Sequence, residues 1–308
     1  MLKQESLDGI SKFSFSAGGG ETSVSFVPGY GGTITELHFF HQGKNFQVLD
    51  GFKTAEQIRM NEKSRSIFLV PFPNRIRDGK YIFKGKEFSL PINKPKENNA
   101  IHGFIWNRNF EIEETKNAIT LRHDYEGEYP GFPFPFSFSV SYELIGTANL
   151  TITFRAINTG KSSMPFGVGW HPYFTFHQPV DTLQLKLPMG DMLETDERLI
   201  PTGIKKQFNQ FQNFQTIGKR DFDHAFELSK PQEGYETSLR ESVSGTTITV
   251  QQDANFKYLQ IYIPPDRNSI ALEPMTCPAN AFNSGEGLMV LEEQEVFESR
   301  IKVKIHNG

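Results

Sequence analysis

The chain has 308 residues and a formal net charge of −4, with charges of both signs scattered along it. Because there is no basic stripe and no Lys/Arg cluster beside an apolar helix, neither nucleic acid nor a membrane is an expected partner. The single cysteine, Cys277, excludes an internal disulfide and a cluster of thiolate metal ligands. The first ten residues contain no apolar stretch typical of a signal peptide, so a cytoplasmic protein is expected.

Alternation of apolar and polar residues with period two dominates the chain. Residues 54–61 are the exception, because they predict one or two helical turns. Downstream, strands are predicted around Phe136, Phe138 and Val140; Leu150, Ile152, Phe154 and Ala156; Leu183, Leu185 and Leu187; and residues 301–305. Many short antiparallel strands separated by turns favour an all-β sandwich or barrel. Since no linker or repeat interrupts the pattern, we expect residues 1–308 to form a single domain.

Two loop segments carry polar residues that could reach a ligand. Prolines and a glycine in residues 71–81 predict a loop in which Arg75 is either solvated or points inward as a hydrogen-bonding fork. In residues 98–106, His102 is either a core histidine or a catalytic group. Gly103 could let a ligand approach the backbone, and Trp106 either packs in the core or offers its ring to an apolar ligand face.

Two ionisable residues stand beside apolar residues and directly before a proline. His171 precedes Pro172, which favours extended backbone, and aromatic residues flank it. A histidine in an apolar wall suits general acid catalysis, but it fits an aromatic corner of the core equally well. Glu273 ends an apolar strand before Pro274. It lies either at a strand tip in water or in a cleft, where its pKa would be raised and it could act as a general base.

The pattern of histidines and carboxylates does not predict a metal site. Asp223 and His224 could be a metal-binding pair or a plain surface turn, and no other segment has metal-ligand spacing. His38 and His41 are three residues apart on an apparent strand, so they point to opposite faces.

Five ordered segments resemble the aldose 1-epimerase (galactose mutarotase-like) family. They are Asn74-Arg75-Ile76 with Gly79; Ile101-His102-Gly103; His171-Pro172-Tyr173-Phe174; Asp223-His224-Ala225-Phe226; and Leu272-Glu273 followed by Pro278 and Asn283. The resemblance extends from Gly31-Gly32 to Glu295. It implies the family fold, a large antiparallel β-sandwich (galactose mutarotase-like supersandwich), which agrees with the predicted strands.

The same resemblance implies an enzyme that interconverts the α and β anomers of a free sugar. Glu273 would take the proton from the anomeric hydroxyl, and His171 would protonate the ring oxygen. His102 would hydrogen-bond at the ring oxygen or anomeric centre. The implied substrate-binding residues are Arg75, Asp223, Asn74 and Trp106. Two coupled proton transfers need no cofactor, so none is expected.

Two alternatives remain open at this point. A hexose-6-phosphate 1-epimerase would need a cationic pocket, for which Arg65 and Arg77 are available. A non-catalytic carbohydrate-binding protein on the same fold would need no acid–base pair. A small-molecule sugar is the expected partner in each case, and the chain is expected to be a monomer or a homodimer.

The implied chemistry sets a geometric expectation. A base and an acid that serve two oxygens on one carbon should lie roughly 5–8 Å apart across one cleft. His102, Arg75 and Asp223 should line that cleft. His171 and Glu273 should each lie at a strand end or turn with the side chain directed inward. An apolar wall should come from Trp106, Trp170 or Phe174.

Overall fold

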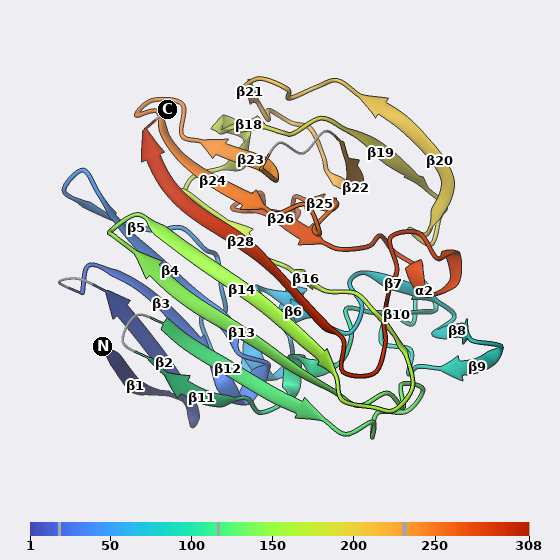
Figure 1. The fold of residues 1–308 in the computed structure, drawn as a ribbon. Helices are drawn as coiled ribbons and strands as arrows, with labels where there is room; N and C mark the ends of the chain where they lie inside the picture. The colour runs from blue at the N-terminus through green and yellow to red at the C-terminus, as the bar shows by residue number, and fades with distance from the viewer. Residues whose placement is uncertain (18–19, 116–117, 230–232, 308) are drawn as a thin grey trace.

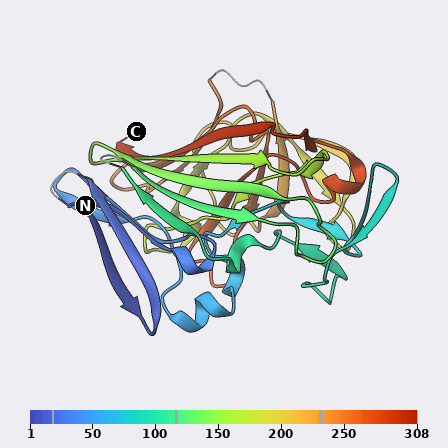
Figure 2. The ribbon, with the colours of Figure 1, turned by 60° about the horizontal axis from the view of Figure 1, so that its bottom comes forward.

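Five N-terminal strands pair in chain order into an antiparallel sheet at one side of the molecule (Figure 1). The computed structural model describes residues 1–17, 20–115, 118–229 and 233–307. The strands are β1 (Leu2–Leu7), β2 (Ile10–Ala17), β3 (Thr22–Val27), β4 (Thr33–His41) and β5 (Lys44–Gln47). Phe15, Val24 and Phe26 are buried because this sheet packs on the strands that follow. Figure 2 shows the blue N-terminal strands beside the long green ones.

A nine-stranded sheet forms one large layer. In spatial order it contains β11 (Glu111–Glu114), β12 (Ala118–Tyr125), β13 (Phe136–Ile145), β14 (Asn149–Asn158), β28 (Val296–Asn307), β24 (Thr246–Gln252), β23 (Tyr235–Arg240), β18 (Gln184–Lys186) and β21 (Gln215–Thr216). The last strand of the chain, β28, lies between β14 and β24 and so joins the two halves of the layer (Figure 1).

A second large sheet of eight strands faces the first. Its order is β20 (Pro201–Phe208), β19 (Gly190–Thr195), β22 (Asp223–Leu228), β25 (Tyr258–Tyr262), β26 (Ile270–Met275), β16 (Gly169–Trp170) and β6 (Phe68–Leu69), and β17 (Tyr173–Phe174) also pairs with β26. Every pairing printed for these strands is antiparallel.

Short elements complete the described part of the chain. Three two-stranded ribbons pair β7 (Arg75–Arg77) with β10 (Asn99–Ile101), β8 (Lys80–Phe83) with β9 (Lys86–Ser89), and β15 (Met164–Phe166) with β27 (Met289–Leu291). The helices are α1 (Ala55–Arg59) and α2 (Ala281–Ser284), with 3-10 turns η1 (Pro28–Tyr30), η2 (Glu62–Ser64), η3 (Ile105–Asn107) and η4 (Val180–Thr182). The predicted helical turn is confirmed by α1, which Thr54 caps by accepting a hydrogen bond from the Gln57 amide.

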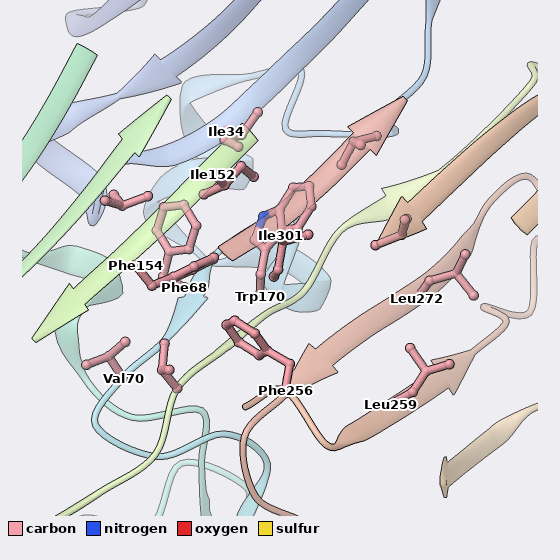
Figure 3. Packing of buried hydrophobic residues seen from close by; sticks show 14 of the residues in the cluster. Ile34, Phe68, Val70, Ile152, Phe154, Trp170, Phe256, Leu259, Leu272 and Ile301 are labelled. Carbon is pink, nitrogen blue, oxygen red and sulfur yellow. The ribbon is translucent and has the colours of Figure 1, made fainter. Parts of the chain in front are cut away.

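The core lies between the two large sheets. On β14, the alternate residues Leu150, Ile152, Phe154 and Ala156 are fully buried, as the period-two pattern predicts. Phe154 meets Phe68 of the opposite sheet edge to face, with ring centroids 5.6 Å apart. Figure 3 shows Phe154, Ile152 and Ile301 packed against Phe68 and Trp170.

The observed layers confirm the predicted all-β sandwich. The patterns at 136–140 and 301–305 correspond to β13 and β28. The pattern at 183–187 is shorter than expected, since Leu183 follows η4 and β18 covers only Gln184–Lys186. Within the described residues, no helix has both the length and the apolar character needed to cross a membrane.

Candidate active site

Strand register places His171 and Glu273 opposite each other. Gly169 of β16 pairs with Met275 of β26, and Tyr173 of β17 pairs with Ala271. Both pairs obey the same antiparallel register, so the position midway between them sets His171 against Glu273. Because successive strand residues point to opposite faces, Glu273 turns away from the core, toward which its neighbour Leu272 points.

A gap in the sheet accommodates the proline that follows His171. The short strands β16 and β17 both pair with β26, and His171 and Pro172 lie in the break between them. Pro274 lacks an N–H for a sheet ladder, and by the same register it lies opposite Trp170 at the end of β16, beside the break. His171 therefore lies at a strand end, as predicted. The expectation for Glu273 was wrong, because it is the fourth of six residues in β26 and its other neighbour is Gln260 of β25.

A close contact between backbones positions His102. The strand β10 pairs with β7 and ends at Ile101, after which His102 and Gly103 both adopt left-handed backbone, with φ of 65° and 64°. The His102 amide donates to the Asn74 carbonyl at 2.9 Å. A Cβ on Gly103 would lie only 1.9 Å from the carbonyl oxygen of Val70. Gly103 thus admits a neighbouring backbone and not, as the sequence suggested, a ligand.

A chain of polar side chains crosses the floor of the site. The Arg75 guanidinium donates to Asn74 Oδ1 at 2.9 Å, and the Asn74 amide donates to Gln260 Oε1 at 3.3 Å. The Gln260 amide then donates to Asp223 Oδ1 at 2.8 Å. Gln260 was not among the residues predicted for the site. The available signal was its position as a polar residue between Leu259 and Ile261 in an apolar strand, where a buried amide needs partners.

These side chains line one cleft with a volume of about 340 Å³. Six of the seven predicted site residues are in its wall: Asn74, Arg75, His102, His171, Asp223 and Glu273. The wall residues to which the sequence assigned no role are Asn61, Lys63, Ser64, Lys94, Ile101, Tyr173, Gln260 and Tyr262. Segments almost 200 residues apart in sequence therefore meet here, as the geometric expectation required.

Five buried polar atoms in this wall have no hydrogen-bond partner among the described residues. They are Asn61 Oδ1, Arg75 Nε, His102 Nδ1, His171 Nδ1 and Glu273 Oε2. Native proteins satisfy most buried polar atoms, and each unsatisfied one carries a cost of about 1–3 kcal/mol. Their concentration in one cleft is typical of a site built to hydrogen-bond a polar ligand.

The acid–base pair is closer than expected. His171 Nε2 lies 3.3 Å from Glu273 Oε1, whereas the sequence-based expectation was roughly 5–8 Å. The reason is the direct opposition of the two residues on adjacent backbone segments, which lets the side chains meet. The ring of His102 stands edge-on to that of His171, with centroids 5.2 Å apart.

Burial shifts the pKa values of the pair in opposite directions. It raises the pKa of the Glu273 carboxyl well above its usual range, an effect that Asp223 reinforces and Arg75 opposes. It lowers the pKa of His171 to about 3, with Lys94 and Arg75 adding to that effect. Burial, followed by the proximity of His171, also lowers the pKa of His102. Both shifts favour the uncharged form of the group concerned, a neutral carboxyl on Glu273 and a neutral imidazole on His171.

Comparison with known proteins identifies the family. The profile described as aldose 1-epimerase matches residues 14–304, which is nearly the whole chain. The chain belongs to the aldose 1-epimerase family.

Relatives within this family are distant. The uncharacterized protein YihR of Escherichia coli (strain K12) is 33% identical over 231 residues, which cover 73% of each chain. Galactose mutarotase of Rattus norvegicus is 27% identical over 66% of this chain and 64% of its own length. Aldose 1-epimerase of Streptococcus thermophilus is 25% identical over 80% of each.

Solved structures share the fold. A galactose mutarotase-like protein from Clostridium acetobutylicum superimposes with a TM-score of 0.90 at 24% identity, covering 100% of this chain and 99% of that one. The GalM/aldose epimerase homologue from C. elegans has a TM-score of 0.84 at 17% identity, with 96% and 99% covered. These likenesses agree with the two-layer architecture described above.

The aromatic wall of the cleft differs from the expectation. Trp170 and Phe174 are fully buried in the core, and the Trp170 indole donates to the Ser66 carbonyl. Tyr173 and Tyr262 line the cleft instead, and Tyr173 stacks on His171 with centroids 5.0 Å apart. Alternation explains the difference, because Tyr173 shares the face of His171, whereas Trp170 and Phe174 occupy the opposite one.

Trp106 is the predicted site residue that the structure leaves outside this cleft. It lies on η3, packs partly on a small cluster around Phe52 and Ile58, and lines a neighbouring cavity. The resemblance therefore misplaced it as a residue of the cleft. Two residues separate His102 from the turn η3, and on that turn Trp106 packs against the Phe52 and Ile58 cluster instead of lining the cleft.

The two arginines considered for a phosphate group also lie outside the cleft wall. Arg65 is paired with Asp50 and Glu62, and Arg77 is paired with Asp196. Within the ranges that the structure describes, no group of three His, Cys, Asp or Glu side chains is arranged to hold a metal ion.

Proposed function

We propose that the chain is a mutarotase, which interconverts the α and β anomers of a free aldose by general acid–base catalysis. The observation that carries the proposal is the His171–Glu273 pair, set in opposition by strand register on the wall of a polar cleft. Five buried, unpartnered polar atoms, two of them on the pair itself, lie on residues of the cleft wall and match the many hydroxyl groups of a sugar.

The reaction requires two proton transfers and no change of oxidation state. In ring opening, the carboxylate of Glu273 takes the proton of the anomeric hydroxyl, and the electrons of that O–H bond form the aldehyde C=O. The C1–O5 bond breaks, and O5 takes a proton from the His171 imidazolium. Rotation about C1–C2 exposes the other aldehyde face. Closure then reverses both transfers.

One proton shared by the pair is sufficient for this cycle. Ring closure needs a protonated Glu273 to give a proton to O1 and a neutral His171 to take one from O5. That is the state which the pKa shifts of both groups favour. Transfer of the proton from the carboxyl to the imidazole, across their 3.3 Å contact, gives the state needed for opening. The same two residues therefore serve both directions of the reaction.

The remaining cleft residues would bind and orient the sugar. The guanidinium of Arg75 and the carboxylate of Asp223 stand at the two ends of the polar chain through Asn74 and Gln260. Such a chain offers hydroxyl groups both donors and acceptors in fixed directions. The rings of His102 and His171 lie edge to face, and this position supports the proposed hydrogen bond from His102 to the sugar near its anomeric centre.

The alternatives receive less support. A phosphate-specific enzyme would use Arg65 and Arg77, which are both paired outside the cleft wall. A protein that only binds sugars would have no use for an opposed carboxyl and imidazole. Competition by a hexose 6-phosphate distinguishes the first alternative, and binding without accelerated anomer exchange distinguishes the second. The cytoplasmic location and the monomeric or homodimeric state stay predictions from sequence.

Polarimetry of freshly dissolved α-anomers tests the proposal. We expect faster relaxation than in buffer for at least one aldohexose or aldopentose, without added metal or nucleotide. Because one group must accept and the other donate a proton, kcat/KM should follow a bell-shaped pH profile. If no sugar in a broad panel exchanges anomers faster than the buffer blank, the proposal fails.

A further inference from the structure

The imidazole of His171 is held through a single nitrogen. Its Nε2 lies 3.3 Å from Glu273 Oε1, whereas its Nδ1 is buried and has no hydrogen-bond partner among the described residues. In hydrolase triads, a carboxylate on the second nitrogen orients the catalytic histidine. One polar contact fixes where Nε2 points but leaves the ring able to turn about that contact. The plane of the His171 ring must therefore be held by a different kind of contact.

Tyr173 lies against one face of this imidazole. The two rings are nearly parallel, with an interplanar angle of 18° and centroids 5.0 Å apart. The contact follows from the chain, because residues two apart in extended backbone direct their side chains to the same side. His102 meets the same imidazole at 81°, so aromatic rings contact it in two directions. Rings packed in this way attract each other and oppose rotation of the imidazole.

Tyr173 is itself fixed on several sides. It is 2% exposed, and its hydroxyl donates to the Lys63 carbonyl at 2.9 Å. Its backbone pairs with Ala271 of β26, the strand that also carries Glu273. The ring of Tyr262 meets that of Tyr173 nearly at right angles, with centroids 6.4 Å apart. Because Tyr173 is tied to the strand of the proposed base, its ring holds the proposed acid in a fixed relation to that base.

The acceptor of the Tyr173 hydroxyl belongs to a strap, residues 61–66, along the wall of the cleft. Left-handed backbone occurs at four non-glycine residues of this strap: Asn61, Lys63, Ser64 and Ser66, with φ of 49°, 56°, 55° and 55°. Such backbone is uncommon outside glycine and clusters at functional sites, where the surrounding structure enforces it. Here the Lys63 ammonium pairs with Asp266 at 2.7 Å. The Ser66 amide donates to the His171 carbonyl at 2.8 Å, so the strap is bonded to both His171 and Tyr173.

We propose that Tyr173 is a positioning residue of the reaction, which acts by holding the imidazole of His171 in the orientation that serves Glu273 and the sugar. The inference rests on the proposed mutarotase function and adds a residue to it. Tyr173 transfers no proton itself. Its hydroxyl already donates to the Lys63 carbonyl, and burial, reinforced by the nearby Glu273, raises the pKa of the phenol well above its usual range. The ring, and not the hydroxyl, is therefore the part that affects the rate.

Steady-state polarimetry on three variants tests this role. Tyr173→Leu removes the ring, and we expect kcat to fall about 3- to 10-fold with KM within about twofold of the wild type, the size of change that loss of one aromatic pair gives. Tyr173→Phe keeps the ring and should retain kcat within about twofold. Phe174→Leu is the matched control, because it removes the ring of the next residue on β17, which packs in the core. This control should lower the melting temperature and leave kcat unchanged.

Nuclear magnetic resonance of 15N-labelled histidine gives a readout that needs no turnover. The chain has eight histidines, and the ring signals of His171 are identified by their absence in His171→Asn. The wild type and Tyr173→Phe should show one sharp set of ring signals for His171. Tyr173→Leu should shift or broaden them, because the imidazole then samples several orientations. Phe174→Leu should leave them unchanged.

Three results would overturn the positioning role. They are equal kcat values in Tyr173→Leu and Tyr173→Phe, a loss carried by KM, and His171 ring signals that do not respond to removal of the Tyr173 ring. If Tyr173→Leu does not fold, Tyr173→Met offers a longer side chain without an aromatic face and replaces it in both measurements. An imidazole whose order depends on Tyr173, in a protein that exchanges no anomers, would refute the proposed function and leave the hold of Tyr173 on His171 standing.

Discussion

Glu273→Gln is the substitution that most directly tests the proton-transfer chemistry. The carboxyl is 2% exposed, so bulk water has little access to replace it as a base. Glutamine keeps the size of the side chain but cannot accept the proton of the anomeric hydroxyl. A positioned base contributes about 10²–10⁴-fold to rate, which equals about 2.7–5.4 kcal/mol of barrier at 1.36 kcal/mol per tenfold. We expect kcat to fall by at least about 10²-fold.

The matched control for this prediction is Glu227→Gln. Glu227 lies on β22 in the same sheet, where it pairs with Lys205 and Lys257 and does not line the cleft. Its variant should retain the wild-type rate in polarimetry. Far-UV circular dichroism and thermal unfolding should show that both variants are folded. A folded Glu273→Gln protein with a kcat within about tenfold of the wild type would refute the role assigned to this carboxyl.

Three further predictions concern the framework of the site. Gly103→Ala should lower the free energy of unfolding in urea by at least about 3 kcal/mol, since the new Cβ would meet the Val70 carbonyl. Gly85→Ala is the control, because Gly85 also has positive φ but lies in open space, and it should cost only about 1–2 kcal/mol. The folded-state pKa of His102 is depressed, so below pH 6.5 the unfolded state binds a proton that the native state excludes. We therefore compare the free energy of unfolding of the wild type with that of His102→Asn. Their difference should shift against the wild type by up to about 1.4 kcal/mol per pH unit as the pH drops from 6.5 to 5. A difference in unfolding free energy that does not change with pH would contradict this reasoning. Gln260→Leu interrupts the polar chain and should lower kcat/KM about tenfold, mainly through KM; an unchanged KM would show that the chain does not orient the sugar.

The sequence predicted the layers better than the fine structure of the sheets. Alternation on 150–156 determined the buried face of β14, because a long strand repeats the pattern often enough to be unambiguous. The two-residue strands β16 and β17 offer no such repeat. They exist because β26 provides a partner, and that pairing depends on residues about 100 positions later in the chain.

For the candidate site too, the sequence predicted which residues take part better than how they are arranged. The ordered motifs identified the residues that meet in the cleft, but not the contacts between them. The direct opposition of His171 and Glu273 is a property of register, which single-sequence patterns do not specify. Gln260 was missed because a lone glutamine in a strand has many structural uses. Tyr173 could have been predicted, since a strand that directs His171 into a cleft directs the residue two positions on the same way.

Because the register of β26 sets Glu273 opposite His171, enzymatic activity also measures how accurately the chain has folded. A slip of β26 by one residue would turn Glu273 toward the core and bring Leu272 into the cleft. Such a chain could keep its secondary structure and pass a spectroscopic check, yet it would lack a base opposite His171. Specific activity per milligram of refolded protein therefore reports the fraction of molecules in the native register, which circular dichroism does not resolve.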